Sequence, residues 1–390
     1  MVTYPQGWET YRVIDVADLF DNLRIPVTKN QRRPGNTPYY GANGIQDYVD
    51  GYTHDGEFVL IAEDGANDLL NYPVTYAKGK IWVNNHAHVI SAKESVAVTK
   101  FLYYLLKKVD YTTFLVGGTR AKLNGKTFKN IEITIPSNTS EQKAISSILS
   151  DLDNHIDNLG KLIEKKKNIR DGALEDLICC RTRLDGFHDD WIKVSFNQVI
   201  VPKARIGWQG LKKHEYLRNG YSYLISGTDF KDGTISLDNI SFVSKERYDM
   251  DENIQVKEND VLVTKDGTIG KVAMVPTLSR PATLNSGVFV FRTAPQLEPA
   301  FLYRVLMSSV FREFIDTLSA GSTIKHLYQK DLKNFKFEMP KDVNEQRAIS
   351  DVLTAMDKEI KNLEAERDKM IQIREGAMDD LLTGRVRLTV

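Results

Sequence analysis

The sequence predicts an α+β protein that contains two similar mixed α/β domains and two long helices, in the order domain, helix, domain, helix. The main observation is an internal repeat, since residues 141–184 align with residues 345–388 without a gap at an offset of 204. Roughly 20 of about 44 positions are identical, which identifies a true duplication. The second observation is an apolar stripe in each copy, and the third is a weaker repeat in the segments that precede the two copies.

Each copy carries apolar residues at alternating spacings of three and four on an otherwise polar background, the pattern of a long amphipathic helix. A narrow stripe on a polar helix needs an apolar partner, and the obvious partner is the other copy. Two unrelated surface helices are the alternative, but they would not require identical polar and glycine positions such as Asp153/Asp357, Arg170/Arg374 and Gly172/Gly376. The residues predicted at the helix-pair interface are Ile145, Leu149, Leu152, Ile156, Leu159, Ile163, Ile349, Leu353, Met356, Ile360 and Leu363.

The segments 1–137 and 185–341 are predicted to be the two domains, each with short strands separated by Gly, Asn and Asp turns. The run 58–65 resembles 260–267, and Asn85 matches Asn285, which sets His86 and His88 opposite Ser286 and Val288. Predicted elements include a strand at 13–16 and helices at 100–108 and 299–318. Between these landmarks the two segments diverge, as expected either for two readers of different ligands or for simple drift after duplication.

Composition indicates a protein with enough apolar residues for two cores. The chain has 390 residues, 42% of them hydrophobic, and 52 basic against 52 acidic side chains. No apolar run approaches the ~20 residues that a membrane span needs, and the N-terminus lacks the core of a signal peptide. The two cysteines, Cys179 and Cys180, are adjacent and therefore poorly placed for a structural disulfide. A reducing, cytoplasmic location is expected.

A zero net charge neither supports nor excludes nucleic-acid binding, because the local distribution of charge decides it. Two stretches are locally basic. Residues 29–33 hold three cations and no acid, and residues 203–218 hold five cations against Glu215 alone. Solvated loops are the simpler interpretation of either stretch by itself.

Motifs of catalysis are not found. The Gly-Lys-Thr at 125–127 lacks the glycine spacing of a phosphate-binding loop and precedes a strand-like segment. His86 and His88 have the spacing of two ligands on one strand, but no cysteine is near and the second segment lacks the pair, so a packing or surface role is favoured over a metal site. The sequence therefore predicts a binding protein with no catalytic residues and no metal.

At this point the residues carry a recognisable pattern. Each domain ends in a strand, a proline, a Glu-Gln pair and a long helix that closes with Arg-x-Arg-Leu; the pairs are Glu141-Gln142 and Glu345-Gln346, and the helix ends lie at 181–184 and 385–388. This arrangement resembles the specificity subunits of type I restriction–modification systems over the whole chain. The departure is Cys179-Cys180, where the second copy has Thr383-Gly384, and it puts the end of the first helix in doubt.

The resemblance implies a DNA reader that catalyses nothing. Residues 1–137 and 185–341 would be target-recognition domains, each reading one half of a bipartite site in double-stranded DNA. Residues 138–184 and 342–390 would form long helices that pair as an antiparallel coiled coil with pseudo-twofold symmetry, set the spacer and dock two methyltransferase subunits. The chain itself would bind no cofactor. S-adenosylmethionine would belong to the methyltransferase subunits, and ATP and Mg²⁺ to restriction subunits that join the complex.

Two alternatives remain open at this stage: a specificity subunit of a type IIB system, and a coiled-coil adaptor that does not bind DNA. If the chain does read DNA, phosphate and base contacts are expected from basic and amide side chains in the loops. The candidates are Lys29, Gln31, Arg32, Arg33, Tyr40, Asn43, Arg120, Lys122, Lys203, Arg205, Lys212, Lys213, Lys265 and Lys325.

Overall fold

The computed structural model describes residues 4–117, 121–207, 210–319 and 326–388. The chain forms two compact units, which we call unit 1 (residues 1–161 and 364–390) and unit 2 (residues 162–363). Each unit contains one mixed domain and part of both long helices, so the predicted α+β class with an internal repeat is confirmed. Within the described residues, no helix is both long and apolar enough to cross a membrane.

The first domain, in unit 1, is built on a six-stranded mixed sheet with the order β2-β7-β5-β6-β3-β4, while β1 and β8 form a separate antiparallel pair. Within the six-stranded sheet β3 runs parallel to β6, and the other neighbours are antiparallel. The strands are β1 (Trp8–Arg12), β2 (Ala17–Leu19), β3 (Pro34–Gly41), β4 (Gly44–Val49), β5 (His54–Ala62), β6 (Val74–Val83), β7 (Ala87–Ala92) and β8 (Glu132–Pro136).

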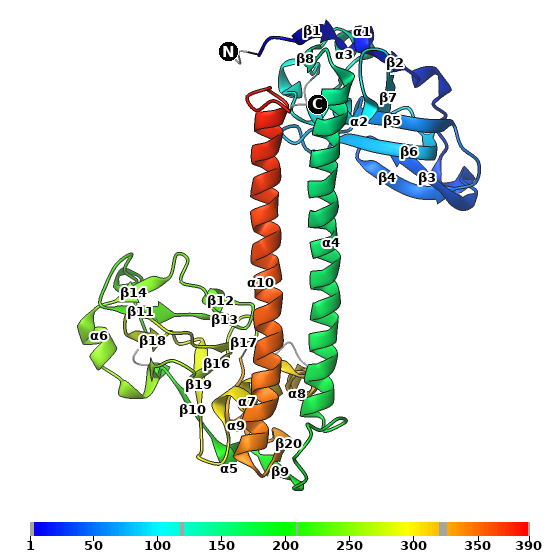
Figure 1. The fold of residues 1–390 in the computed structure, drawn as a ribbon. Coiled ribbons are helices and arrows are strands. Elements are labelled where there is room, and N and C mark those ends of the chain that lie inside the picture. The colour runs from blue at the N-terminus through cyan, green and yellow to red at the C-terminus, as the bar shows by residue number, and fades with distance from the viewer. Residues whose placement is uncertain (1–3, 118–120, 208–209, 320–325, 389–390) are drawn as a thin grey trace. The chain divides into compact units, whose positions relative to one another are not determined.

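Helices cover one face of this sheet (Figure 1). The larger core packs β5 and β7 against α2 and against parts of both long helices, with Phe101 and Ile145 fully buried. A smaller cluster that includes Phe58 and Leu60 fills the opposite face. The helical elements are α1 (Val13–Val16), η1 (Asp21–Leu23), η2 (Lys29–Gln31), α2 (Thr99–Lys107), η3 (Tyr111–Thr113), α3 (Gly125–Lys129) and α4 (Thr139–Ile178), the last of which continues into unit 2.

The second domain, in unit 2, repeats this plan with additional strands. Its sheets have the orders β10-β19-β16-β17-β13-β12 and β14-β11-β18-β15, and β9 pairs with β20 as β1 does with β8. The strands are β9 (Trp191–Ser195), β10 (Ile200–Ala204), β11 (Ser222–Ile225), β12 (Phe230–Lys231), β13 (Thr234–Ile235), β14 (Ser241–Val243), β15 (Gln255–Val256), β16 (Val261–Thr264), β17 (Val272–Met274), β18 (Ala282–Leu284), β19 (Val288–Thr293) and β20 (Lys336–Pro340).

The core of unit 2 packs β16 and β19 against α7 and against both long helices, with Phe301 and Leu353 fully buried. A further cluster around Leu262 and Val290 fills the other face of the sheet. The helical elements are α5 (Phe196–Val199), η5 (Lys213–Glu215), η6 (Gly227–Asp229), α6 (Lys245–Asp249), η7 (Glu252–Ile254), α7 (Pro299–Met307), α8 (Ser309–Ser319), α9 (Gln329–Leu332) and α10 (Val343–Leu381), the last of which continues into unit 1.

The two sequence predictions that fail here concern local structure. Residues 13–16 form one helical turn, α1, rather than a strand, because the backbone and side chain of Arg12 bind Asp15 and close the turn. The single helix predicted at 299–318 is broken at Ser308, whose backbone is extended. A new helix, α8, begins at Ser309. The amide and the hydroxyl of Ser309 donate hydrogen bonds to the carboxylate of Glu175.

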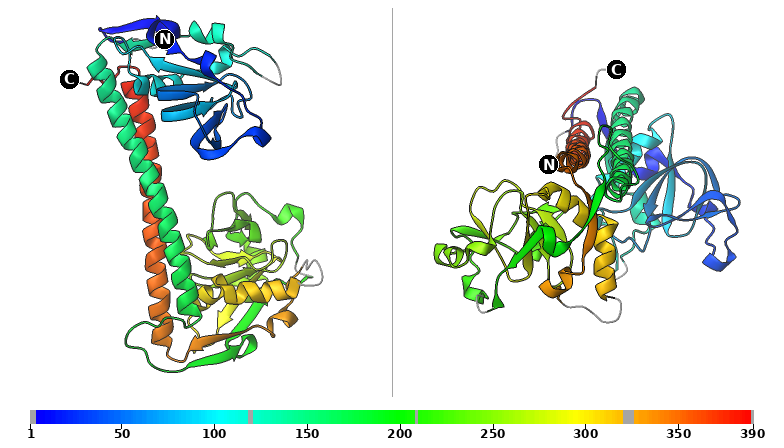
Figure 2. Two further views of the ribbon diagram at one scale, coloured as in Figure 1. Left: turned by 90° about the vertical axis from the view of Figure 1, so that its right-hand side faces the viewer. Right: turned by 90° about the horizontal axis from the view of Figure 1, so that it is seen from below.

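Parts of α4 and α10 lie side by side within each unit in both views of Figure 2. In unit 1, Arg374 of α10 contacts Asp153 of α4 at 3.4 Å, and in unit 2, Arg170 of α4 contacts Asp357 of α10 at 2.5 Å. The charged residues that are identical in the two copies therefore form crosswise ion pairs, in which the arginine of one copy binds the aspartate of the other. Because residue numbers rise along one helix as they fall along the other, the pairing is antiparallel, as predicted.

The Glu-Gln and Arg-x-Arg-Leu motifs also meet crosswise. In unit 1 Glu141 accepts hydrogen bonds from Nε and Nη2 of Arg387, and in unit 2 Glu345 accepts from the same two nitrogens of Arg183. A buried carboxylate and a planar guanidinium form a strong two-bond pair. Each glutamine, Gln142 or Gln346, donates to the proline carbonyl that ends the preceding strand and accepts from the backbone amide of the residue just before α2 or α7.

The end of the first helix is settled by backbone conformation. Cys180 has a φ of 54°, and Gly384, its counterpart at an offset of 204, has a φ of 69°. A left-handed residue commonly ends a helix, and glycine adopts this conformation most readily. The cysteine therefore ends α4 in the same manner as the glycine ends α10, at a higher conformational cost.

Candidate nucleic-acid interface

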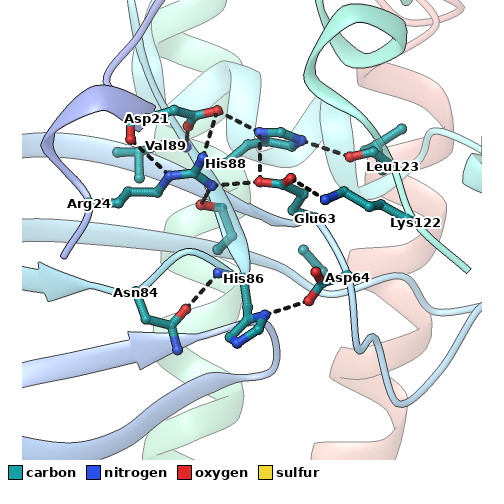
Figure 3. A network of polar contacts seen from close by, with 12 residues as sticks. Asp21, Arg24, Glu63, Asp64, Asn84, His86, His88, Val89, Lys122 and Leu123 are labelled. Atoms are coloured by element: carbon teal, nitrogen blue, oxygen red, sulfur yellow. Dashed lines mark hydrogen bonds and ion pairs between the residues drawn. The ribbon is translucent and has the colours of Figure 1, made fainter. Parts of the chain in front are cut away.

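Three segments meet at one edge of the first domain (Figure 3). They are the Glu63-Asp64-Gly65 turn after β5, His86 before β7, and the returning segment at Lys122. The amide of Glu63 donates to the carbonyl of His86 at 2.9 Å, and the amide of Leu123 donates to the carbonyl of Glu63 at 2.8 Å. We call this arrangement the turn cluster. Main-chain hydrogen bonds fix it, so its side chains can vary without loss of the frame.

A network of ion pairs next to the turn cluster stabilises it. Glu63 accepts from Arg24 at 2.7 Å and contacts Lys122 at 2.9 Å, while the buried His88 contacts Asp21 at 2.7 Å. Burial opposes the ionisation of Glu63, but hydrogen bonds from Lys122 and Arg24 outweigh it, so the pKa of Glu63 lies below its usual value. Burial likewise opposes ionisation of Asp21, and the hydrogen bond and charge of His88 lower its pKa overall.

The same network bears on metal binding. Ligand atoms of Asp21, Glu63 and His88 lie within 4.8 Å of one another, which is close enough to surround an ion. However, Arg24 and Lys122 already neutralise the two carboxylates, and His88 uses its second ring nitrogen on the carbonyl of Leu123 at 2.8 Å. Two cationic side chains at this distance disfavour a divalent cation. The group is better explained as a structural ion network.

Two other side chains connect the turns at this edge. Asn43, in the turn after β3, donates to the carbonyl of Gly65 at 2.9 Å and accepts from the amide of Asn67 at 3.0 Å. Asn84 accepts from the amide of His86 at 2.8 Å. Amide side chains in loops were expected to contact DNA bases. The side chains of Asn43 and Asn84 instead form hydrogen bonds that order the turns.

The second domain has the same cluster. The amide of Lys265 donates to the carbonyl of Gly287 at 2.9 Å, and the amide of Leu327 donates to the carbonyl of Lys265 at 2.8 Å. Gly65 and Gly267, with φ values of 68° and 71°, end the equivalent Asp-Gly turns in the left-handed conformation that glycine favours. The backbone frame is therefore shared by the two domains.

This frame corrects one alignment made from the sequence. The amides of Asn84 and Asn285 donate to the carbonyls of Tyr40 and Ile225, the equivalent ends of β3 and β11. Asn285 therefore corresponds to Asn84 and not to Asn85. Accordingly, His86 lies opposite Gly287, and His88 lies opposite Phe289 instead of Val288. Two consecutive asparagines in the first domain allowed either alignment, and only the main-chain hydrogen bonds distinguish them.

A second polar feature of the first domain lies beside β3. The guanidinium of Arg32 lies 4.0 Å from the centre of the Tyr39 ring, which stacks on Trp82. These side chains line a cavity of about 270 Å³ together with Gln31 and Arg33. Three residues predicted to contact DNA are thus brought together, although Arg32 also pairs with Asp47 at 3.3 Å.

Two predicted DNA contacts are corrected by their burial. Tyr40 is 8% exposed and packs in the cluster around Phe58, and Arg205 is 2% exposed and donates to the carbonyl of Leu284. Burial lowers the pKa of Arg205. Neither side chain can reach a phosphate or a base edge in this structure. Tyr40 lies within β3 and Arg205 directly follows β10, so the loop position expected for both side chains is wrong.

The other candidates differ in accessibility. Lys29, Gln31, Arg33, Asn43, Lys212 and Lys213 are exposed, whereas Arg32, Lys203 and Lys265 are half-buried. The side chain of Lys122 is 46% exposed despite its pair with Glu63. Arg120 and Lys325 lie outside the described residues. Among the described candidates, Lys122 belongs to the turn cluster of the first domain, Asn43 bonds to it, and Lys265 belongs to the turn cluster of the second.

The predicted helix stripe divides between two environments. Ile145 and Leu149 belong to the core of unit 1, and Ile349, Leu353 and Met356 pack in the core of unit 2. The remaining members lie outside these cores: Leu159, Ile163 and Ile360 are buried, and Leu152, Ile156 and Leu363 are half-buried. The ends of the stripe therefore anchor the domains to the helices, and the role of its middle residues between the helices stays a prediction.

Sequence reasoning missed four residues of the turn clusters: Asp64, Asp266, His86 in its role as a partner of Asp64, and His326. The available signal was the Asp-Gly pair that follows a buried strand in both domains. It identified the repeat but did not indicate which histidine approaches each aspartate, because the two histidines come from different segments.

Comparisons with known proteins agree on one family. The family model described as type I restriction modification DNA specificity domain matches residues 5–167 and 209–372. A putative type I restriction enzyme specificity subunit of Haemophilus influenzae is 30% identical over 338 residues, covering 86% of this chain and 84% of the relative. A type I restriction enzyme specificity subunit of Methanocaldococcus jannaschii is 25% identical over 414 residues, covering 98% and 94%.

Among solved structures, the S subunit of a type I restriction–modification system from Mycoplasma genitalium matches with a TM-score of 0.67 at 17% identity, over 96% of both chains. A chain from a structure of a type I restriction–modification system, described as showing complex assembly and conformational transition, matches with a TM-score of 0.56 at 14% identity. The match covers 98% of this chain and 100% of that chain. These two likenesses show the fold. Together with the family model, they establish that the chain belongs to the type I restriction–modification DNA specificity family, as a specificity subunit with two target-recognition domains.

Proposed function

We propose that this chain is the non-catalytic DNA reader of a methyltransferase and endonuclease complex, and that each domain reads one half of a bipartite, asymmetric site. The observation that supports this most directly is the turn cluster. The two domains share its main-chain frame and differ in its side chains, with His86 and Lys122 in one and Gly287 and His326 in the other. One frame with two sets of polar side chains suits two readers of different sequences.

The long helices, in this proposal, set the spacer between the half-sites and dock two methyltransferase subunits. Apolar side chains remain exposed at equivalent positions of the two copies: Ile148 and Val352 are 38% and 36% exposed, and Ile169 and Ile373 are 48% and 43% exposed. Unit 1 carries Ile148 with Ile373, and unit 2 carries Val352 with Ile169. Two equivalent sets of exposed apolar side chains suit two copies of one partner.

The cofactors follow from this division of labour. S-adenosylmethionine would be bound by the methyltransferase subunits, which transfer a methyl group to adenine. ATP and Mg²⁺ would be bound by restriction subunits. This chain would supply the position of the complex on DNA and no reacting group, so its own residues need only hold the two domains and their polar turns.

The test is methylome sequencing of cells that co-produce this chain with the methyltransferase subunit of its system. The expected result is methylated adenine in both halves of one bipartite motif, absent when either protein is produced alone. A coiled-coil adaptor that does not read DNA would leave no motif. A type IIB system would differ by cleaving DNA on both sides of the same motif when the complete complex is purified.

Docking can be tested separately with one substitution on the exposed apolar surface. Ile148→Asp should weaken binding of one methyltransferase subunit, because it places a carboxylate in an apolar contact. Asn158→Asp adds the same charge at an exposed polar position of α4 and serves as the matched control. Subunit stoichiometry measured by native mass spectrometry should fall from two to one in the first variant only. Two methyltransferase subunits in both variants would contradict this docking surface.

A further inference from the structure

Each turn cluster contains a histidine that faces the aspartate of the Asp-Gly turn. In the first domain Nδ1 of His86 lies 2.5 Å from Oδ1 of Asp64, and in the second Nδ1 of His326 lies 2.5 Å from Oδ1 of Asp266. The two aspartates are equivalent in the shared frame, but the histidines are not. His86 precedes β7, whereas His326 occupies the position of Lys122.

The same pair is therefore built twice from different segments of the chain. Gly287 occupies the position of His86 in the second domain, and a Cβ placed there would lie 3.5 Å from the Cβ of Asp266. A histidine at 287 would thus also point toward the aspartate. The aspartate is the constant element, and each domain supplies a histidine to it by its own route. Both routes bring Nδ1 of a histidine to Oδ1 of the equivalent aspartate.

The geometry fixes which ring nitrogen is available. An ionised carboxylate only accepts hydrogen bonds, so Nδ1 of each ring carries a proton and donates to the aspartate. Nε2 then points away, and within the described part of the chain neither Nε2 has a protein partner. The rings are accessible, since the side chains of His86 and His326 are 48% and 53% exposed. In the neutral ring, Nε2 is a hydrogen-bond acceptor.

The charge beside each ring favours one kind of DNA group over another. A carboxylate next to the histidine repels phosphate, so the pair is poorly suited to the DNA backbone. In the major groove the exocyclic amino groups of cytosine and adenine are donors, and they are the groups that an acceptor can read. The main-chain bonds of Glu63 and Lys265 hold each turn, as a reader of base edges requires.

We propose that Asp64–His86 and Asp266–His326 are specificity-determining pairs, and that Nε2 of each histidine accepts a hydrogen bond from the amino group of one cytosine or adenine in its own half-site. This rests on the proposed function, because it presumes that each domain reads a half-site. It goes further by naming the atoms in each domain and the chemical class of base that they read.

The test uses the complex of this chain with its methyltransferase subunit and three variants, His86→Ala, His326→Ala and, as control, His188→Ala, an exposed histidine outside both clusters. Each is scored by methylome sequencing. His86→Ala should relax one position of one half-site, where a base with a major-groove amino group is required, by about tenfold in discrimination. His326→Ala should relax one position of the other half-site. His188→Ala should leave the motif unchanged.

Further variants separate base reading from simple support of the turn. The asparagine of Asp64→Asn can either donate to or accept from Nδ1, so it no longer fixes which ring nitrogen of His86 carries the proton. This variant should relax the same position of the half-site as His86→Ala, while the complex remains assembled. In the second domain, His326→Lys should relax one position, and adding Gly287→His should restore discrimination there. Restoration supports the view that the aspartate, and not the segment that supplies the histidine, defines the contact.

The outcomes distinguish this inference from the proposed function. If the unchanged complex produces no bipartite motif, the proposed function fails. If that motif appears but survives both histidine substitutions unaltered, or if they weaken methylation of matched and mismatched DNA equally, only the specificity-determining pairs are wrong. An assembled Gly287→His/His326→Lys complex that stays relaxed would overturn the equivalence of the two routes.

Discussion

The two domains share a backbone frame and differ in how it is supported. In the first domain the turn cluster rests on a partly buried ionic network of Asp21, Arg24, Glu63 and His88. In the second, the residues opposite Glu63 and His88 are Lys265 and Phe289, and the ammonium of Lys265 lies 5.4 Å from the centre of the Phe289 ring. One frame can thus be held by charge pairs or by a cation over an aromatic ring. Main-chain hydrogen bonds, not particular side chains, are what the two turn clusters share.

A second comparison concerns where the domains meet the long helices. Glu175 of α4 and Asp379 of α10 are equivalent residues. Glu175 binds the amide and hydroxyl of Ser309 at the start of α8, whereas Asp379 pairs with Lys108. Both positions carry a carboxylate, but its partner is the start of α8 in the second domain and a lysine side chain in the first. The same position of the repeat can therefore join its domain through different hydrogen-bond donors.

The largest expected effect comes from exchanging one domain. Replacing residues 191–341 with the same segment of a relative of different specificity should replace one half-site completely and leave the other unchanged, because the turn clusters belong to separate units. Methylome sequencing of the hybrid complex reads both halves at once. A hybrid that alters both half-sites would show that the domains do not read independently.

A four-residue insertion after Leu159 should change the spacer instead. It adds about one helical turn, roughly 6 Å of axial length, and nearly preserves the apolar stripe. DNA rises about 3.4 Å per base pair, so the spacer should lengthen by about one or two base pairs while both half-sites stay the same. Circular dichroism checks the helices, and methylome sequencing reads the spacer. An active variant with the original spacing would contradict the idea that the helices set the distance.

The repeated domains and the helix pair could be predicted from the sequence, because a pattern that occurs in both copies of a duplication is not expected to arise by chance. Helical periodicity and the identities at Asp153/Asp357 and Arg170/Arg374 indicated a helix pair, and the structure explains the identities as crosswise ion pairs. The turn clusters could not be predicted. Their aspartates are repeated, but which histidine approaches each one depends on main-chain hydrogen bonds between segments far apart in the sequence. The prediction that Arg205 contacts DNA failed because a charged side chain was expected to be exposed. Its guanidinium instead donates to the carbonyl of Leu284, which makes burial possible.

The equivalent aspartates of the helices should differ in their effect on stability. Asp357→Ala removes the partner of Arg170 and of the buried Arg304, and should destabilise unit 2 by about 2–3 kcal/mol. Asp153→Ala removes a longer pair with Arg374 and the hydrogen bond from Tyr104, and should cost unit 1 about 1–2 kcal/mol. Hydrogen exchange of amides in each unit measures the two effects separately. Asp157→Ala, at an exposed position of α4, is the control. Equal losses would mean that the buried guanidinium adds nothing.

Acid should affect the two domains in opposite directions at their ionic sites. The pKa values of Asp21 and Glu63 are lowered in the folded first domain, so their contribution to stability is present above the unfolded value of about 4 and is lost as pH falls through the folded value. Burial raises the pKa of Asp260 in the second domain, so acid relieves a cost there. Amide exchange in β5 and β16, followed as pH falls from about 5 to about 2.5 and corrected for intrinsic rates, should show earlier opening of β5. Glu63→Gln should reduce that difference, and unchanged behaviour in this variant would assign the effect elsewhere.

The smallest expected effect concerns exposed cations outside the turn clusters. Lys29 in the first domain and Lys213 in the second are both accessible, and neither has an ion pair among the described residues. Replacing either with Ala should weaken binding of the complex to matched and mismatched DNA alike and lower the salt slope by about one, because one released counterion is lost. Arg205→Lys makes a useful contrast, since a side chain that is 2% exposed should leave the salt slope unchanged and affect stability instead. Fluorescence anisotropy across a series of salt concentrations provides the slopes. If Lys29→Ala weakened only matched DNA, Lys29 would be a base reader, and the basic stretch at 29–33 would belong to the specificity surface together with the turn cluster.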